Sequence, residues 1–107
     1  MSHIRPVPTL FDVIGDPSRR QVLDLLRDDE YSVTELVDAL DMSQPSVSKH
    51  LRVLRDAGLV EARVDAQRRI YALCPEPLAE LDAWLKPYRR FWRGRLESLQ
   101  RHLARDD

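Results

Sequence analysis

The sequence predicts a mainly helical domain with one small β-hairpin, an α+β arrangement in a single folding unit of 107 residues. Apolar residues recur at helical spacing up to residue 57 and again after residue 75, whereas residues 60–73 alternate with a period of two. A chain of this length forms one domain, and residues 1–107 contain no linker and no internal repeat. We therefore expect one hydrophobic core in which helices pack against a two-stranded ribbon.

Two helices are predicted before residue 30. The first carries Leu10, Phe11 and Ile14 at helical spacing, and we expect Gly15 to close it in the left-handed conformation. Asp16 suits the N-cap of the second helix, because its carboxylate can accept free backbone N–H groups, and Pro17 suits the first helical position. This second helix ends in the acidic run 28–30, and its apolar face consists of Val22, Leu23 and Leu26.

Two further helices follow, joined by a short connection. Ser32 opens a short helix whose inward face consists of Leu36, Val37 and Leu40. After a break at residues 41–42, Ser43 is the N-cap of a helix over residues 43–57, which Gly58 closes. The buried stripe of this fourth helix consists of Val47, Leu51 and Leu54.

A β-hairpin is predicted over residues 60–73, where apolar and charged side chains alternate. Its turn at Ala66 and Gln67 lacks the favoured Asn-Gly chemistry, so we expect a loose tip. Two helices joined by a short turn and followed by a hairpin make a winged helix-turn-helix. In that fold, residues 43–57 are the recognition helix and residues 60–73 are the wing.

A long terminal helix is predicted over residues 75–104, beginning at Pro75 or Pro77 and bent at Pro87, which removes one helical hydrogen bond. Its apolar stripe is too long for so small a body to cover: Leu78, Leu81, Leu85, Tyr88, Trp92, Leu96, Leu99 and Leu103. Such a stripe is left for another surface to cover, and oligomerisation would help to stabilise so small a core. The candidate interface residues are Leu10, Phe11, Leu81, Leu85, Tyr88 and Trp92.

The middle of the chain is basic although the net charge is −1. Residues 42–74 hold six basic and three acidic side chains, whereas residues 1–41 hold four arginines and nine carboxylates. Opposite the buried stripe of helix 43–57 lie short hydrogen-bonding groups and cations, which suit base edges and phosphates of double-stranded DNA. The candidate DNA-binding residues of this helix and of the wing are Gln44, Ser46, Ser48, Lys49, Arg52, Arg63, Arg68 and Arg69.

Several other classes of protein are disfavoured. Three glycines leave no loop to cradle a phosphate, and no nucleophile elbow or pair of catalytic carboxylates is present, so we expect neither an enzyme nor a cofactor. The longest apolar run, residues 70–74, is far shorter than the roughly 18 residues of a membrane span. The first residues contain no apolar leader, so we expect a cytoplasmic protein without a membrane partner.

At this point the motifs resemble a known family. Residues 16–20 (Asp-Pro-Ser-Arg-Arg), residues 33–36 (Val-Thr-Glu-Leu), the string 43–51 (Ser-Gln-Pro-Ser-Val-Ser-Lys-His-Leu) and residues 57–60 (Ala-Gly-Leu-Val) resemble the ArsR family of bacterial winged-helix transcriptional regulators. The resemblance covers roughly residues 8–103. It implies a homodimeric repressor that binds an operator, dimerises through its first and last helices, and releases DNA when it senses a signal.

The chain departs from the metal-sensing members of that family. In arsenic- and cadmium-type sensors, the helix before the recognition helix begins with a Cys-Val-Cys-x-x-Cys pattern. The corresponding positions here are Ser32, Thr34 and Val37, and none of them supplies a thiolate for a soft metal. The sequence therefore resembles the non-metal-sensing branch, and we predict no metal ligands.

Two sensing alternatives stay open. Zinc- and nickel-type members use Asp and His ligands on the last helix, where an antiparallel dimer could bring His102 towards Glu80 and Asp82, about 30 Å away along one helix. Zinc needs three or four ligands, and a pair of neutral imidazoles is missing. Cys74 precedes Pro75 at the expected N-cap of the last helix, where a thiol pKa can be depressed, so a redox response is the second alternative.

Two questions concern the partners. The aromatic residues Trp84, Tyr88, Phe91 and Trp92 could line a pocket for an unknown small-molecule effector, although at helical spacing they equally suit a dimer core. A winged helix can also serve as a protein-interaction module. Such a module has no need of a basic wing and recognition helix, so the sequence favours DNA.

Overall fold

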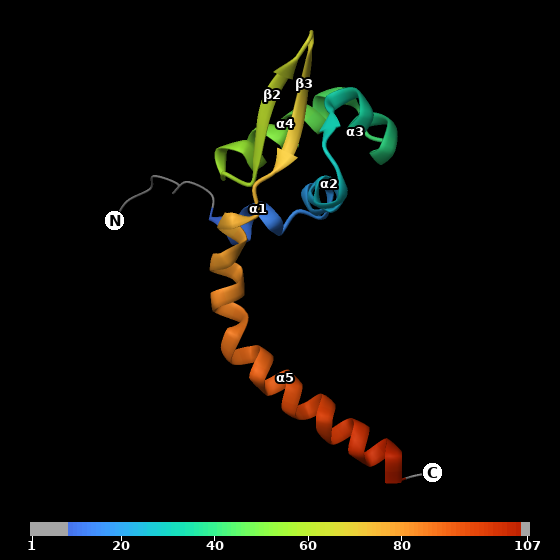
Figure 1. The fold of residues 1–107 in the computed structure, drawn as a ribbon, viewed down its shortest axis with the longest axis vertical. Helices are drawn as coiled ribbons and strands as arrows, with labels where there is room; N and C mark the ends of the chain where they lie inside the picture. Colours follow the sequence, from blue (N-terminus) through green and yellow to red (C-terminus); the bar gives the residue numbers. More distant parts are fainter. Residues whose placement is uncertain (1–8, 106–107) are drawn as a thin grey trace, which may run out of the picture.

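The computed structural model describes residues 9–105 (Figure 1). Its mainly helical architecture with a small antiparallel sheet confirms the predicted fold class. In chain order the elements are α1 (Leu10–Ile14), α2 (Pro17–Asp28), β1 (Tyr31–Ser32), α3 (Val33–Leu40), α4 (Gln44–Asp56), β2 (Val60–Asp65), β3 (Arg68–Leu73), the 3-10 turn η1 (Glu76–Leu78) and α5 (Ala79–Arg105).

Side-chain caps begin the helices at the predicted positions. The Asp16 carboxylate accepts the N–H of Ser18 at 2.7 Å, and Pro17 takes the first position of α2. Ser32 and Glu35 form a reciprocal capping box at the start of α3, with N–H to oxygen distances of 2.8 and 3.2 Å. Ser43 caps α4 in the same way as Asp16 caps α2.

Gly15 does not close α1 in the left-handed conformation, and that expectation is wrong. Its φ is −68°, in the right-handed region. The carbonyl groups at the end of α1 are satisfied by arginines of α2 instead: Arg19 donates to the Val13 oxygen at 2.6 Å and Arg20 to the Ile14 oxygen at 2.8 Å. These bonds join the two helices. Gly58, after α4, does have a positive φ of 77°.

The sheet has one strand more than predicted. The short strand β1 pairs antiparallel with β3, so the order is β1-β3-β2 and β3 is central. Strands β2 and β3 pair without interruption from Val60 with Leu73 to Asp65 with Arg68. The hairpin therefore turns at the predicted residues, Ala66 and Gln67, with Ala66 in the left-handed region at φ 60°.

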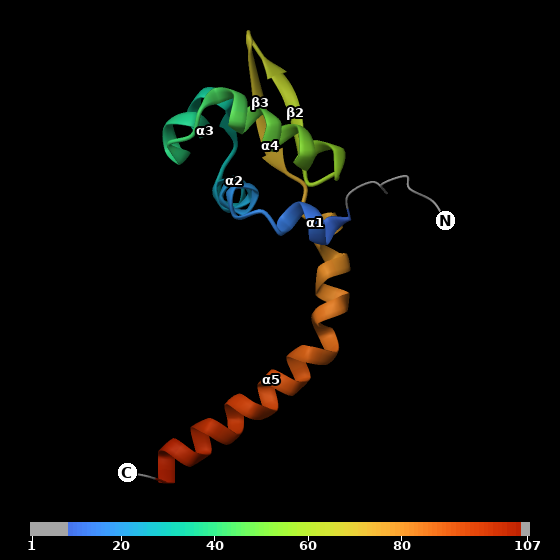
Figure 2. The ribbon, with the colours of Figure 1, turned by 180° about the vertical axis from the view of Figure 1, so that it is seen from behind.

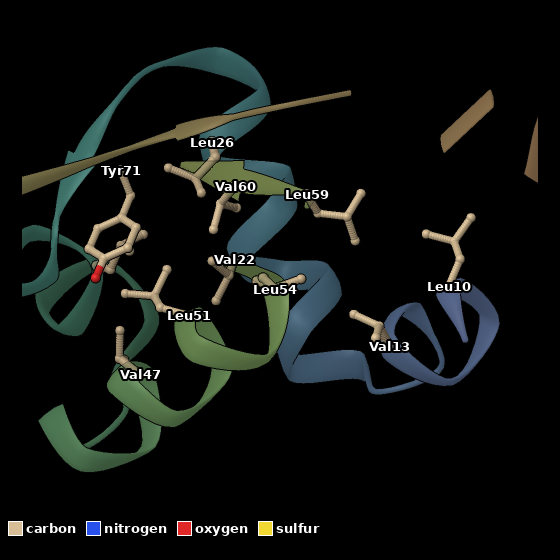
Figure 3. Packing of buried hydrophobic residues seen from close by; sticks show 11 residues of the cluster. Leu10, Val13, Val22, Leu26, Val47, Leu51, Leu54, Leu59, Val60 and Tyr71 are labelled. Atoms are coloured by element: carbon tan, nitrogen blue, oxygen red, sulfur yellow. The ribbon is translucent and has the colours of Figure 1, made fainter. Parts of the chain in front are cut away.

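The core lies between α1, α2, α3, α4 and the base of the hairpin (Figure 3). The predicted stripe of α4 is fully buried, and it faces Val22 and Leu26 of α2 and Tyr71 of β3. Leu36 of α3 is also completely buried. The three helices α2, α3 and α4 thus form a compact unit from which the hairpin projects.

The last helix begins later than predicted and leaves this unit. Residues 76–78, which include Pro77, form a 3-10 turn, and α5 begins only at Ala79. Helix α5 then extends away from the body and bends part-way along (Figure 2). Its interior Pro87 explains the predicted bend. Within residues 9–105, no helix is both long and apolar enough to cross a membrane.

Candidate nucleic-acid interface

Helix α4 presents a polar and cationic face to solvent. Ser43, its cap, places the first turn so that the side chains opposite the buried stripe are all exposed: Gln44, Ser46, Ser48, Lys49 and Arg52. The Ser43 hydroxyl donates to the Ser46 hydroxyl oxygen at 2.9 Å, which leaves the proton of Ser46 available to another acceptor. The first acidic residue of the helix is Asp56, in its last turn. This face therefore offers donors and positive charge without an acidic neighbour.

The three arginines of the hairpin do not form one cluster. Arg63 pairs with Ile70 and Arg68 with Asp65 on one face of the sheet, whereas Arg69 pairs with Val64 on the other. Arg63 is also bound to Glu30, with Nη1 2.5 Å from Oε1. Arg69 thus belongs with α4, and Arg63 and Arg68 belong to the outer face of the wing.

A groove of about 390 Å³ separates α4 from β3. Ser48, Arg52 and Arg55 of α4 line one side, and Arg69 of β3 lines the other. The buried side chains of Leu51 and Tyr71 also line it, and Asp56 is the acidic residue in the lining. Arg55 was not among the sequence-predicted candidates. Its position three residues after Arg52, on the neighbouring turn of the same helix, was the available signal.

The apolar stripe of α5 is exposed along most of its length. The exposed large apolar side chains of this helix are Trp84, Tyr88, Phe91, Trp92, Leu96, Leu99 and Leu103. Phe11 of α1 contacts Trp84 edge-to-face, with ring centroids 5.7 Å apart, and Trp84 contacts Tyr88 at 5.0 Å. Phe11 and the α5 stripe therefore form one continuous apolar surface. Leu10 differs, because it is buried in the core of its own chain.

The comparisons with known proteins agree on one family. Residues 16–62 match the family described as bacterial regulatory protein, arsR family. The chain is 40% identical over 87 residues to an arsenic resistance transcriptional regulator of Pseudomonas putida, covering 80% of this chain and 68% of that protein. It is 36% identical over 112 residues to the arsenical resistance operon repressor of Escherichia coli, covering 100% and 92% of the two chains.

Solved structures give the same result. The crystal structure of an ArsR family transcriptional regulator superposes with a TM-score of 0.66 at 34% identity, covering 78% of this chain and 86% of that one. Reduced HlyU from Vibrio cholerae superposes with a TM-score of 0.61 at 38% identity, covering 74% and 84%. The chain belongs to the ArsR family. It is a DNA-binding transcriptional regulator with a winged helix-turn-helix fold, and its named ArsR-family relatives are regulators rather than enzymes.

The residues at the start of α3 do not fit the thiolate site of arsenic- and cadmium-type ArsR proteins. Ser32 is buried, and its hydroxyl accepts the Glu35 N–H as the helix cap. Thr34 and Val37 offer no thiolate, so the donor set is wrong for a soft metal. Among residues 9–105, no group of three or more His, Cys, Asp or Glu side chains is arranged to hold a metal ion.

One of the alternative zinc-type candidates, Asp82, has another partner in this structure. Arg89 forms a hydrogen-bonded ion pair with Asp82, and this bond holds the pKa of the Asp82 carboxyl below its usual value. Arg89 donates as well to the Asp82 carbonyl oxygen at 2.9 Å. Asp82 and Arg89 flank Pro87, which has no backbone N–H and so leaves one hydrogen bond of α5 unmade. Asp82 therefore has a structural role in α5.

Cys74 is not the N-cap of a helix, contrary to expectation. It follows β3, and the 3-10 turn after it is capped by Pro75, without a side-chain hydrogen bond. Burial and the neighbouring Glu61 carboxylate raise the pKa of the Cys74 thiol. Less thiolate is present at neutral pH as a result, which argues against the redox alternative.

Proposed function

We propose that this ArsR-family chain is a homodimeric repressor that binds an inverted-repeat operator with one α4 helix in each of two major grooves. The observation that carries the proposal is the exposed face of α4, where Lys49 and Arg52 have no ion-pair partner in the described part of the chain and no acidic residue precedes Asp56. A surface of this kind is complementary to base edges flanked by phosphates.

The proposed roles divide by position. Gln44, Ser46 and Ser48, in the first turns of α4, read base edges, because the N-terminal part of a recognition helix enters the major groove. Lys49 and Arg52 contact either guanine or phosphate. The wing arginines Arg63, Arg68 and Arg69 contact the phosphate backbone. Arg63 keeps this role while bound to Glu30, because a guanidinium has five N–H donors.

Dimerisation sets the spacing of the two reading helices. The exposed stripe of α5, continuous with Phe11, is an apolar surface that a second copy of the chain would bury. A twofold dimer places the centres of its two half-sites one helical turn, about 34 Å, or a multiple of it apart, and hence requires an inverted repeat. A pocket made by Trp84, Tyr88, Phe91 and Trp92 for a small-molecule effector would also need the partner, because all four side chains are exposed in the single chain.

The proposal is tested by selecting bound fragments from a genomic library at ~0.1 M salt. We expect recovery of fragments that share an imperfect inverted repeat. Failure to bind any duplex specifically would favour the protein-interaction module instead.

A pair of variants then separates base reading from phosphate binding. Gln44→Ala loses hydrogen bonds to a base edge, so it should relax discrimination at one symmetric pair of positions by about 1–3 kcal/mol. Arg68→Ala, the matched phosphate variant on the wing, should weaken binding to all sequences equally and flatten the salt dependence. If the two variants behave alike across sequences, α4 is not the reading helix.

A further inference from the structure

We propose that the groove between α4 and β3 is a binding site for the sugar–phosphate backbone of DNA, and that Arg55, which was not among the sequence-predicted candidates, is one of its phosphate ligands together with Arg52 and Arg69. The inference rests on the proposed function. It deepens that function by naming the ligand of the groove, a phosphodiester strand, and the three arginines from two different elements that hold it.

The groove is built from both proposed DNA-contacting elements. Arg52 and Arg55 project from the last turns of α4, and Arg69 projects from the facing side of β3. Arg69 reaches this side because of the strand register, which directs Arg63 and Arg68 to the opposite face of the sheet. The volume of about 390 Å³ is also lined by Val33 and by the buried side chains of Leu51 and Tyr71.

The guanidinium groups along this groove are not neutralised by an ion pair within residues 9–105. In the described residues, Arg27, Arg63 and Arg89 are each bound to a carboxylate. No hydrogen bond or ion pair within residues 9–105 engages Arg52, Arg55 or Arg69. Asp56 is the single carboxylate in the groove lining, so three positive charges face one negative charge. Such a site favours an anion, and the arginines can each bind a phosphate through two N–H groups.

The geometry of B-DNA supplies the reason why the anion is a backbone strand. The major groove of B-DNA is bordered by the sugar–phosphate strands. With α4 in the major groove and the wing at the backbone, as proposed above, one such strand would lie along the groove between α4 and β3. Arg55 is eleven positions after Gln44, about 16 Å along the helix. It is therefore displaced from the base-reading end of α4 towards the phosphates at the edge of the major groove.

The test measures operator affinity as a function of salt for the full-length chain and its Arg55→Ala and Arg69→Ala variants. The control is Arg27→Ala, which removes an exposed arginine from α2, away from the groove. Each subunit contributes one groove, so loss of one contact per subunit should lower the salt slope of the dimer by about 2 and weaken binding roughly a hundredfold at ~0.1 M salt. The loss should be the same on the operator and on unrelated duplex, and Arg27→Ala should bind as the wild type does.

Two further measurements distinguish a lost phosphate contact from misfolding of the alanine variants. Asp56→Asn removes the opposing charge and should tighten binding to all duplexes. Operators that carry a neutral methylphosphonate at single positions identify the phosphate: at one position in each half-site, neutralisation should weaken the wild type but leave Arg55→Ala unchanged.

The outcomes separate this inference from the proposed function. If the wild type binds its operator specifically while Arg55→Ala keeps the wild-type salt slope, the groove is not a phosphate site and the proposed function stands. The same conclusion follows if every methylphosphonate affects Arg55→Ala and the wild type equally. If the wild type binds no duplex specifically, both proposals are wrong.

Discussion

Replacing Trp92 by glutamate tests whether the exposed stripe of α5 is the dimer interface. Trp92 lies in the middle of that stripe and is 48% exposed in the single chain, so it belongs to no part of the protomer core. A glutamate there leaves the packing of α2, α3 and α4 untouched. In a dimer, it would place an unpaired carboxylate in an apolar contact.

The size of the effect follows from the exposed area. An aromatic side chain buries about 150–250 Å², so the exposed 48% of Trp92 corresponds to roughly 100 Å² available to a partner. At about 25 cal/mol per Å², its burial contributes about 2.5 kcal/mol per subunit and about 5 kcal/mol per twofold dimer. Loss of that contribution raises the dimer dissociation constant by three to four orders of magnitude, at about 1.4 kcal/mol per tenfold. The desolvated carboxylate adds to this cost.

Sedimentation equilibrium over a range of chain concentrations measures the effect directly. We expect a dimer for the wild type and a monomer for Trp92→Glu at micromolar concentration, with circular dichroism reporting whether the helices remain. Arg101→Glu is the control, since it places the same side chain on the opposite face of α5, about 180° around the helix. A wild-type chain that sediments as a stable, folded monomer, or a Trp92→Glu variant that stays dimeric, would refute the assignment of the stripe.

Two other predictions concern the signal and the stability of the fold. Stoichiometric zinc, cadmium or arsenite should leave operator affinity unchanged, because Ser32, Thr34 and Val37 provide no thiolate; a tenfold loss of DNA binding with any of these ions would overturn the non-metal assignment. Asp16→Ala should lower the free energy of unfolding by about 1 kcal/mol at neutral pH, measured by urea denaturation. Burial opposes ionisation of Asp16, but the N–H groups of Ser18 and Arg19 outweigh it and lower the pKa of the carboxyl, so the cap is effective above about pH 4 and is lost as the pH falls through the folded-state pKa. The stability gap between wild type and variant should therefore close on acidification, and a gap that persists at pH 2 would contradict the capping role.

The helices were predictable because their boundaries depend on single side chains. Asp16, Ser32 and Ser43 each cap a helix in the way their chemistry suggests. The conformation of Gly15 was not predictable, because it depends on two arginines of the next helix that reach back to the carbonyl groups. The strand β1 was missed for a similar reason: two residues have no period, and only pairing with β3 makes them a strand.

The residues of the candidate DNA interface could be predicted from the sequence, but which of them lie on the same face could not. A helical projection identified the exposed face of α4 from Gln44 to Arg52, and the structure exposes all of those candidates. The faces on which the wing arginines lie depend on the register of β2 with β3, which in turn depends on the turn at Ala66. Arg55 became a candidate only when β3 was placed beside it.

The pairing of β1 with β3 has a mechanical consequence for regulation. Ser32 both caps α3 and pairs with Ile70 in the wing, and Glu30, two residues earlier, is bound to Arg63. Rotation of helix α3 would therefore strain these contacts with the hairpin, so the structure couples the helix-turn-helix to the wing. In the dimer proposed above, induction that leaves these contacts intact would change the distance and the angle between the two DNA-binding units. An effector of that dimer would therefore act by altering the spacing between operator half-sites that the dimer can span.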